Sequence, residues 1–455
     1  MSIFDWMVSA GLAVAINAAA AEANVEPQTT TLQNSAVREV TRAFLLDRIH
    51  GGWIGMLIGG LEGLPHEFKY KEQPRDTLPE FTFLEKGARS DDDNDFEWTH
   101  LWFMDQEGAL KLPYPRLVEI WKANMNQGIW VANKRARELM DQGVMPPETG
   151  SAALNPHAHY NLSGQFCVES YGMIAPGMPQ TAADLALHYA RIAVSEEPLQ
   201  AAQYWTALIS LIAFHEGPLE TAIEAALEAA DPASAMAEAV ADARRLHREH
   251  PRNWKAARQA VHRKWVQQRQ WNMNSTPSNG ALVLLALLYG EGDFYRTLQY
   301  AMALGYDADC NAATAGAVIG TRLGFRHIAA LPQFKMPGRY INRTRPSLPA
   351  ESRVSDQAET LMRLCERVIL TNGGERIEVD GQPAYRVRLQ TPRTIEMLQN
   401  NAKPRLLILT DIGGNPDDQQ SMIRLMPVQW CASSKMLAAA LGCDNARGLI
   451  RNLIG

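Results

Sequence analysis

The sequence predicts a mainly α-helical protein, in which one large helical domain is followed by a small α+β extension. Stretches rich in Ala, Leu and Glu, with apolar residues at helical spacing, occupy most of the first 345 residues. Runs typical of β-strands are almost absent before residue 375. A chain of 455 residues with 46% hydrophobic and 21% charged residues has enough apolar side chains to build a sizeable core.

The N-terminus resembles a signal peptide. Residues 7–21 (MVSAGLAVAINAAAA) are apolar, and Ala21-Glu22-Ala23 offers an A-x-A-type cleavage site. We therefore expect a signal peptide over residues 1–23, a periplasmic or secreted protein, and no membrane association of the mature form, because the apolar stretch is too short to span a bilayer. The preceding residues carry Asp5 and no Lys or Arg. The alternative is an Ala-rich helix start in a cytoplasmic protein.

The expected helices follow in order along residues 24–345, which we predict as the helical domain. The first spans residues 34–60 and ends in a glycine-rich stretch, which indicates a close helix approach or a tight bend near a site. The same spacing of apolar residues predicts further helices over residues 115–142, 181–213, 219–250, 279–290, 294–304 and 312–323.

A linker composition at residues 341–353 (INRTRPSLPAESR) separates this part from an extension over residues 346–400. The extension is expected to hold a helix over residues 354–370 and then two strands. The strands, residues 376–379 and 384–389, flank an Asp-Gly pair that is typical of a hairpin turn.

Charge and cysteine content exclude several classes of protein. The formal net charge is −6 and there is no long basic run, so no nucleic-acid partner is expected. The five cysteines are far apart and form no CxxC pair, which argues against a structural zinc site and against a disulfide framework.

The first candidate site is the acidic run SDDDNDFE at residues 90–97. It places Asp91, Asp92, Asp93 and Asp95 within five positions. Adjacent carboxylates repel one another unless water, cations or protonation intervene. The run is therefore either a solvated surface loop or a cation site, and taken alone it favours the loop.

The second candidate site is GYDADCNAATAGAVIGTRLG, residues 305–324. Asp307 and Asp309 precede a helix of small residues, which indicates very close packing. A carboxylate at this point can cap the helix, but capping does not account for both aspartates. Aspartate oxygens at the mouth of a tightly packed helix suit Mg²⁺, Mn²⁺ or Ca²⁺.

The third candidate is GLPHEF, residues 63–68, where Glu67 follows a turn after the first apolar helix. Desolvation would raise the pKa of this carboxyl group and suit it to acid/base work. A surface glutamate is an equally good interpretation of these residues alone.

Together these elements resemble the ADP-ribosylglycohydrolase family. RIHGGWIGMLIGGLEGLPHEF is similar to the family's opening R-x-x-G-x-x-x-G-x-x-x-G-D-x-x-G-x-P-x-E-F, and the acidic run is similar to its T-D-D-T element. GYDADCNAATAG resembles its G-x-D-T-D-[T/C] element, and ESYGMIAPGMPQTAADLALHYA resembles its G-x-x-x-P-G-x-P-x-x-A-A segment. The resemblance covers residues 40–340.

The resemblance implies an all-α domain that holds two Mg²⁺ ions, or Mn²⁺, and hydrolyses an N- or O-glycosidic, ADP-ribosyl-like bond in a small molecule or an ADP-ribosylated substrate. It assigns the metal ligands to Asp91, Asp92, Asp93, Asp307, Asp309 and Cys310, with Ser90 as first ligand if the first element is shifted by one. It assigns the catalytic carboxyl group to Glu67.

The sequence departs from the family pattern at several positions. Gly60 stands where Asp is usual, Asn94 where Thr is usual, and Cys310 where many members have Thr or Ser. Residues 195–198 occupy the place of the S-H-T-type element. A thiol is a poor ligand for Mg²⁺. These departures extend the expected substrates to other glycosides, and the alternative function is a non-catalytic protein that binds ADP-ribose or a sugar.

The C-terminal stretch RLLILTDIGGNPDDQQSMIRLM, residues 405–426, resembles the start of a nucleoside-hydrolase-like domain. Its apolar run 405–410 is expected to be a buried strand, and Asp411, Asp417 and Asp418 match the acidic loop of that group in type. Such a domain needs a whole α/β sheet. Because only 29 residues follow Met426, we expect residues 401–455 to be a truncated or frameshifted second domain.

Overall fold

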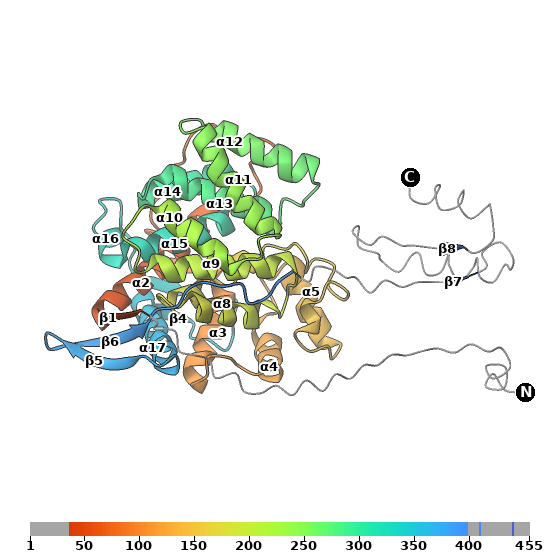
Figure 1. Ribbon diagram of the computed structural model, residues 1–455. Coiled ribbons are helices and arrows are strands. Elements are labelled where there is room, and N and C mark those ends of the chain that lie inside the picture. The colour runs from red at the N-terminus through yellow and green to blue at the C-terminus, as the bar shows by residue number, and fades with distance from the viewer. Residues whose placement is uncertain (1–35, 399–408, 411–438, 441–455) are drawn as a thin grey trace, which may run out of the picture. The chain divides into compact units, whose positions relative to one another are not determined.

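A computed structural model describes residues 36–398 and the pairs 409–410 and 439–440 (Figure 1). The expected signal peptide lies outside the described residues, as does the expected truncated domain apart from those two pairs. Within the described part of the chain, no helix is both long enough and apolar enough to cross a membrane.

The mainly helical fold predicted from the sequence is confirmed. The helices are α2 (Arg42–Gly63), α3 (Asp92–Glu107), α4 (Tyr114–Asn124), α5 (Val131–Asp141), α6 (Ser163–Phe166), α7 (Glu169–Met173), α8 (Pro179–Ala190), α9 (Glu197–Ile212), α10 (Leu219–Ala225), α11 (Ala235–Glu249), α12 (Trp254–Val261), α13 (Thr276–Gly290), α14 (Phe294–Leu304), α15 (Ala308–Leu323), α16 (Phe325–Ala329) and α17 (Val354–Thr371). A π-helical turn, His262–Gln268, continues α12.

The strands form small sheets. One sheet has the order β1-β6-β5 and is antiparallel throughout, with β1 at Val37–Thr41, β5 at Glu375–Val379 and β6 at Gln382–Arg388. A second has the order β2-β3-β4, with β2 at Ala88–Arg89, β3 at Arg339–Ile341 and β4 at Glu351–Arg353. The two-residue strands β7 (Leu409–Thr410) and β8 (Ala439–Ala440) pair in parallel.

The first expected helix is wrong over its opening residues. The chain is extended as β1 before α2 begins at Arg42, because β1 pairs with β6 from the other end of the described chain, in a register that sets Val37 opposite Arg388. Thr41 then caps α2 by accepting a hydrogen bond from the amide of Phe44. The spacing of apolar residues near position 40 cannot indicate the pairing of β1 with β6, which is about 345 residues away in the sequence.

Three long expected helices are each broken into two. The stretch 115–142 divides into α4 and α5 around Gly128, which has a left-handed φ of 57°. The stretch 181–213 divides into α8 and α9, and Pro198 lies in the first turn of the second helix. The stretch 219–250 divides into α10 and α11. By contrast, α13, α14, α17 and the β5–β6 hairpin lie where the sequence predicts them, with bounds that differ by three residues or fewer.

The close approach of α2 to α15 organises the core and confirms the prediction made from the small residues of both segments. A Cβ atom at Gly59 would lie 1.9 Å from the carbonyl oxygen of Ala312, and one at Gly55 would lie 2.2 Å from that of Gly316. Contacts this short leave no room for a side chain. At the end of α2, a Cβ atom at Gly63 would lie 2.5 Å from the Cα atom of Asp309, so the packing brings the chain after α2 beside the start of α15.

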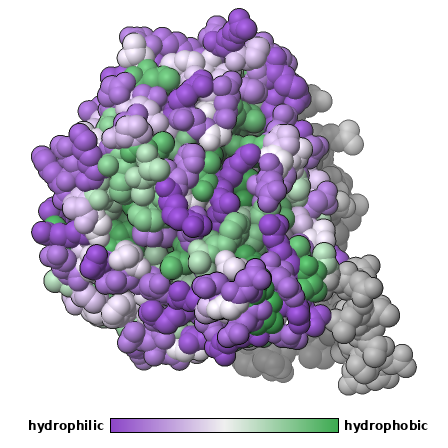
Figure 2. Space-filling model, turned by 90° about the vertical axis from the view of Figure 1, so that its left-hand side faces the viewer, coloured by the Kyte–Doolittle hydropathy of each residue, from purple (hydrophilic) through white to green (hydrophobic). Residues whose placement is uncertain are grey.

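The helix and hairpin expected as an extension pack on this helical core. The indole of Trp53 on α2 donates to the side chain of Gln357 on α17 across 2.9 Å, and both groups are buried. Figure 1 shows the β1-β6-β5 sheet beside α2 and α17. The face seen in Figure 2 carries hydrophobic patches among predominantly hydrophilic residues.

Candidate metal centre

The acidic run is the start of a buried helix, which corrects the interpretation as a solvated loop. Asp91 is the N-cap of α3, and its carboxylate accepts from the amide of Asp92 across 3.1 Å. Asn94 completes a reciprocal capping pair with Asp91. Asp93 and Asp95 are only 2% and 1% exposed, because the first turn of α3 lies beneath the surrounding helices.

The second acidic element lies at the start of α15. Asp307 and Asp309 are 4% and 5% exposed. Asp307 accepts a hydrogen bond from the side-chain amide of Asn274 across 2.8 Å, and Asn274 in turn accepts from the side chain of Asn161. This amide network fixes the orientation of the Asp307 carboxylate.

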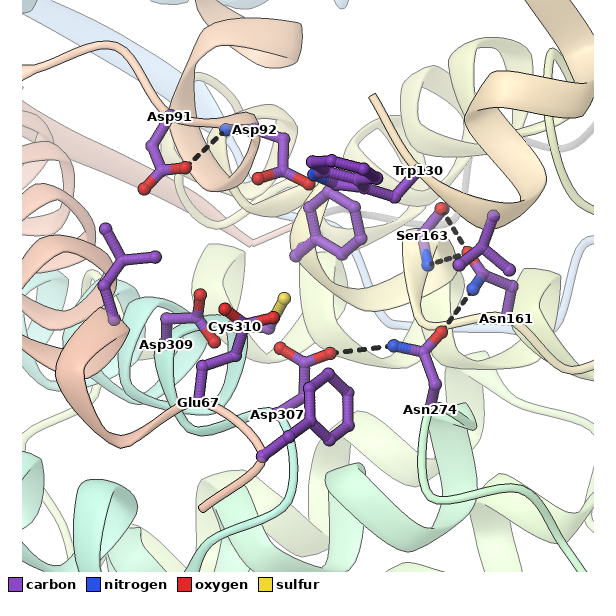
Figure 3. Close-up of a pocket in the computed structure, with 14 residues that line it drawn as sticks. Glu67, Asp91, Asp92, Trp130, Asn161, Ser163, Asn274, Asp307, Asp309 and Cys310 are labelled. Atoms are coloured by element: carbon purple, nitrogen blue, oxygen red, sulfur yellow. Dashed lines mark hydrogen bonds between the residues drawn. The ribbon is translucent and has the colours of Figure 1, made fainter. Parts of the chain in front are cut away.

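Glu67 follows the short 3-10 turn after α2 and faces the same region (Figure 3). As a residue Glu67 is exposed, whereas Asp307 and Asp309 are buried. The carboxyl group of Glu67 is still partly desolvated by the walls of the site. Glu67, Asp307 and Asp309 each offer an oxygen within 4.8 Å of the others. Asp93, Asp309 and Cys310 form a second such group, which shares Asp309 with the first.

A cavity of about 510 Å³ opens between these elements. Five carboxylates line it together with amide, hydroxyl, thiol and apolar side chains. The described residues around it are Leu64, Glu67, Phe68, Asp91, Asp92, Trp130, Val131, Asn161, Ser163, Phe166, Asn274, Asp307, Asp309 and Cys310. The structure thus brings all seven residues singled out from the sequence to one place: six line the cavity, and Asp93 lies behind it in contact with Cys310.

Burial of so many carboxylates changes their ionisation. Burial raises the pKa of Asp93 and of Asp309 well above the usual range, and mutual repulsion between these acids adds to the effect. Burial and the charges of Asp307 and Asp91 also raise the pKa of Glu67. Without compensating positive charge, the site therefore favours partly protonated carboxyl groups.

Several of these oxygens have no protein partner. Oδ2 of Asp91, Oδ2 of Asp93 and Oδ1 of Asp309 are buried and accept no hydrogen bond. Buried carboxylate oxygens are normally hydrogen-bonded or bound to a cation. Carboxylate oxygens are the ligands that Mg²⁺, Mn²⁺ and Ca²⁺ prefer, so the residues present fit a divalent-cation site.

Cys310 differs from the carboxylates in its surroundings. Its thiol donates to Oδ1 of Asp93 across 2.8 Å, and its carbonyl oxygen accepts from the hydroxyl of Thr314 across 3.1 Å. Burial raises the pKa of the thiol well above its usual range, which keeps it a neutral donor. Gly60 lies beside the same carboxylate, because a Cβ atom there would be 3.4 Å from Oδ2 of Asp93.

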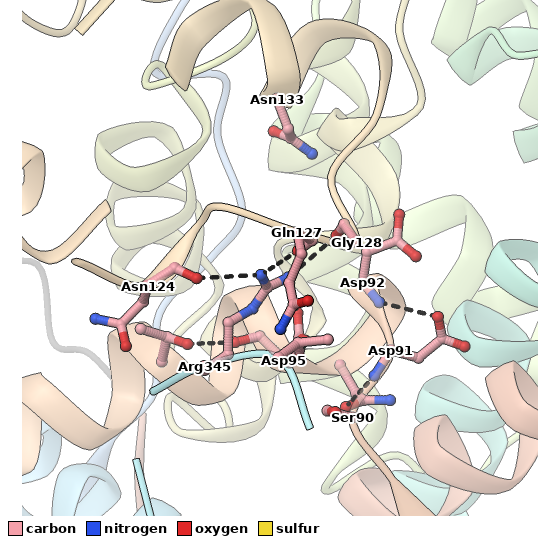
Figure 4. Close-up of polar contacts among 12 residues, drawn as sticks. Ser90, Asp91, Asp92, Asp95, Asn124, Gln127, Gly128, Asn133 and Arg345 are labelled. Carbon is pink, nitrogen blue, oxygen red and sulfur yellow. Dashed lines mark hydrogen bonds and ion pairs between the residues drawn. The ribbon is translucent and has the colours of Figure 1, made fainter. Parts of the chain in front are cut away.

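Two acidic-run residues point away from the cavity. The hydroxyl of Ser90 accepts from the amide of Arg343 across 2.8 Å. Asp95 forms a buried ion pair with Arg345, with 2.5 Å between Oδ1 and Nη2 (Figure 4). The guanidinium of Arg345 also donates to the carbonyl oxygens of Gln127 and Gly128, across 2.7 and 3.2 Å. Arg345 therefore joins the first turn of α3 to the loop between α4 and α5.

Sequence reasoning missed the neutral residues around the cavity. Trp130 lies on the α4–α5 loop, within a stretch expected to be continuous helix, and no local pattern marks it. Asn274 precedes α13 in the polar run NMNSTPSN, which was the only available signal for it. Asn161 and Ser163 lie in a segment without regular spacing.

The chain is similar to known proteins over the residues that form this site. A family model described as ADP-ribosylglycohydrolase matches residues 41–375, which is well over half of the chain. A solved structure titled "ADP-ribosylglycohydrolase-related protein complex" is 18% identical, with 71% of this chain and 99% of that chain covered and a TM-score of 0.41. No curated protein matches the sequence. The resemblance of residues 405–426 to a nucleoside hydrolase finds no support in these comparisons.

Proposed function

Because the chain belongs to the ADP-ribosylglycohydrolase family, we propose that it is a divalent-metal-dependent hydrolase that cleaves an N- or O-glycosidic bond of the ADP-ribosyl type. The family supports a glycohydrolase fold and suggests a glycosyl hydrolase. The observation that carries the proposal is the overlap of two acidic groups at Asp309, with unpartnered oxygens on Asp91, Asp93 and Asp309 itself.

The residues that would hold two Mg²⁺ or Mn²⁺ ions are those of the two acidic elements. They are Asp91, Asp92, Asp93, Asp307 and Asp309. The neutral thiol of Cys310, a poor ligand for Mg²⁺, would orient the Asp93 carboxylate beside them. When bound, the cations supply Lewis acidity and positive charge that orients sugar hydroxyls. Asp93 and Asp309, whose pKa values burial raises, would hold such an ion in their ionised form.

The reaction needs water and a proton acceptor. The bond from the anomeric carbon to the leaving nitrogen or oxygen breaks, and the oxygen of a water forms a new bond to that carbon through an oxocarbenium-like state. One proton of the water passes to a carboxylate, and the leaving group takes up a proton. Glu67 is suited to this exchange, since it faces the cavity and burial raises its pKa above the usual value of a glutamate.

The remaining polar residues orient these groups. Asn274 holds the Asp307 carboxylate in one direction, and Asn161 holds Asn274. The capping pair of Asp91 and Asn94 fixes the start of α3, so that Asp92 lines the cavity. A site held in this way loses little entropy when a substrate binds.

The test compares Asp309→Ala with Asp141→Ala, a control at an exposed carboxylate on α5. We expect Mg²⁺ or Mn²⁺ to raise the melting temperature of the native chain and of the control, with no rise for Asp309→Ala. Hydrolysis of ADP-ribosylated substrates should depend on the same metal and be lost in Asp309→Ala. Full metal-stimulated activity in Asp309→Ala would contradict the proposal. Metal-dependent stabilisation by ADP-ribose, without cleavage of any glycoside, would instead identify the non-catalytic alternative.

A further inference from the structure

A completely buried arginine on α12 holds two segments of the site together. Arg258 is 0% exposed, and its Nε donates to the carbonyl oxygen of Leu304, the last residue of α14, across 2.7 Å. Its Nη2 donates to the carbonyl oxygens of Tyr70 and Lys71, across 3.2 and 2.5 Å. The same guanidinium lies over the ring of Tyr306, 4.1 Å from its centroid. One side chain therefore joins the loop after α2 to the turn before α15.

The loop after α2 and the turn before α15 also contact each other directly. The amide of Phe68 donates to the carbonyl oxygen of Tyr306 across 2.8 Å, and the amide of Tyr306 donates to that of Tyr70 across 3.2 Å. A Cβ atom at Gly305 would lie 2.2 Å from the same oxygen of Tyr70, so a residue with a side chain does not fit there. The carbonyl oxygen of Tyr70 is thus a junction at which the loop, the turn and Arg258 meet.

Glu67 lies between two anchored points of the loop after α2. Before it, a Cβ atom at Gly63 would lie 2.5 Å from the Cα atom of Asp309, so the chain is packed directly on α15. After it, Arg258 binds the carbonyl oxygen of Lys71. Figure 3 shows Glu67 beside Asp309, and their carboxylate oxygens lie within 4.8 Å of each other. Release of the second anchor would let the Glu67 carboxyl group move away from the acidic residues of α15.

The next turn of the same helical segment supports this contact. Nδ1 of His262 lies 2.8 Å from the hydroxyl oxygen of Tyr306, and Nε2 of His262 lies 3.0 Å from a carboxylate oxygen of Glu72. His262 is 2% exposed. Arg258 and His262 are four residues apart, so they lie on one face of the helix, and both contact Tyr306. This face of α12 therefore holds the loop and the turn in one arrangement.

The partners of Arg258 distinguish it from Arg345, which is also fully buried. Arg345 forms an ion pair with Asp95, whereas the hydrogen-bond acceptors of Arg258 among the described residues are backbone carbonyl oxygens. Burial of a guanidinium without a counter-ion costs free energy, and an apolar side chain would fill the same volume at a lower cost. An apolar side chain could not supply the fork of hydrogen bonds that crosses from the turn to the loop.

We infer that Arg258 is a positioning residue for hydrolysis, which holds the Glu67 carboxyl group in place against Asp307 and Asp309. The inference rests on the proposed function and adds to it a residue that does not line the cavity. Arg258 acts through the backbone of the loop after α2 and does not reach the substrate. Its effect on the rate can be large, because misplacing a catalytic group by about 1 Å can lower the rate about 100-fold.

Amide hydrogen exchange of the full chain, followed by mass spectrometry, measures the order of the loop without any substrate. In Arg258→Lys, one ammonium group cannot reach the acceptors of the turn and the loop together, so we expect residues 68–72 to exchange at least about fivefold faster. Arg258→Met avoids a buried charge and is the second variant, with the same expected result. Arg345→Lys is the matched control and should instead speed exchange in residues 125–130, the loop that Arg345 holds.

Steady-state hydrolysis with Mg²⁺ tests whether Arg258 acts through Glu67. The probes are peptides ADP-ribosylated on arginine, an N-glycoside, and on serine, an O-glycoside. We expect Arg258→Lys to lower kcat about 10- to 100-fold with little change in KM, since a displaced Glu67 acts less well in the transition state. In a Glu67→Gln background, the same substitution should lower kcat by less than about twofold. Arg345→Lys should change kcat by the same factor in both backgrounds.

Unchanged exchange of residues 68–72 in both Arg258 variants would overturn the inference, whether or not the chain is an active hydrolase. Faster exchange together with losses of kcat that multiply in the Arg258→Lys/Glu67→Gln variant would also overturn it, because Arg258 would then order the loop without acting through Glu67. Faster exchange in the variants of a chain that hydrolyses neither peptide would refute the proposed function while supporting the ordering of the loop by Arg258. The two failures are thus distinguishable.

Discussion

The thiol of Cys310 donates a hydrogen bond to Oδ1 of Asp93 across 2.8 Å and thereby joins the start of α15 to the start of α3. Both side chains are buried. The contact assigns a role to a residue type that is a weak ligand for Mg²⁺, because a neutral thiol can orient the carboxylate without coordinating a cation. The second oxygen of Asp93 stays without a protein partner.

This contact predicts different outcomes for two substitutions of Cys310. Cys310→Ser supplies a hydroxyl that can donate to Asp93 and is a harder ligand, so we expect Mg²⁺ affinity to be equal to or higher than that of the native chain. Cys310→Ala leaves Oδ1 of Asp93 buried and unpaired and should lower the metal-free stability by about 1–3 kcal/mol. Thermal melting over a Mg²⁺ titration measures both effects. Loss of Mg²⁺ binding in the serine variant alone would show that the sulfur itself is required.

Two adjacent glycines of α2 provide a matched test of the helix contact. Gly59→Ala places a methyl group 1.9 Å from a backbone oxygen of α15, so the helices must separate, and we expect a loss of about 3 kcal/mol or more in the free energy of unfolding. Gly60→Ala meets its nearest atom at 3.4 Å and should be neutral or stabilise by up to about 1 kcal/mol through helix propensity. Chemical denaturation of the metal-free variants measures the difference. Equal stabilities would contradict the close packing of α2 on α15.

Removing one partner of the buried Arg345–Asp95 ion pair should destabilise the folded chain more than replacing both partners by apolar residues. Both side chains are 1% exposed. Arg345→Met leaves Asp95 without its counter-ion and should cost about 3–5 kcal/mol, whereas the double variant Asp95→Leu/Arg345→Met should recover part of that loss. Arg345→Lys keeps the charge but cannot reach the loop carbonyl oxygens together with Asp95. A double-mutant cycle by urea denaturation gives the coupling energy, and additive effects would exclude the ion pair as a stabilising contact.

The buried carboxyl group of Glu169 predicts a pH dependence of stability. Burial raises its pKa to about 7, while its oxygens accept from the hydroxyl of Thr314 and the amide of Val168. The folded chain keeps this proton at pH values where the unfolded chain has lost it. The contribution of Glu169 to stability is therefore fully present below the unfolded pKa and is lost as the pH rises from there through about 7.

Glu169→Gln should remove this contribution, since the amide mimics the protonated acid. Between pH 5 and pH 8, without metal, we expect the melting temperature of the glutamine variant to fall less than that of the native chain. Only the native chain has a carboxyl group at position 169 whose pKa differs between the folded and unfolded states, by about two units. Parallel melting curves across this range would show that Glu169 is ionised in the folded chain. Asp141→Asn is the control, because this carboxylate is exposed.

The spacing of apolar and turn residues along the sequence predicted an element correctly where that element is stabilised mainly by contacts within itself. Helices α14 and α17 begin at the predicted residues, because their apolar faces repeat at helical spacing. The β5–β6 hairpin forms around the Asp-Gly turn, in which both turn residues have positive φ. The breaks inside the long helical stretches were not predicted, since they depend on contacts such as that of Arg345 with the α4–α5 loop.

The residues of the candidate site likewise fall into those that the sequence indicated and those that it did not. The acidic elements around Asp92 and Asp307 stand out in the sequence because carboxylates repel one another and are rarely placed together without a reason. Trp130 and Asn274 do not stand out, because a single tryptophan or asparagine in a polar segment has many structural explanations. Trp130 and Asn274 are recognised as part of the site only because the folded chain places them in the wall of one cavity.

By itself, therefore, the sequence determined the helical class, the family and the acidic residues from which a metal site can be built. Only the tertiary structure decided that the two elements, more than 200 residues apart, face one cavity, and that Cys310 lies against Asp93. The physical reason is the glycine and alanine packing of α2 on α15, which sets distances that no local pattern contains. Burial then decided the ionisation of the carboxyl groups, since desolvation depends on every surrounding element.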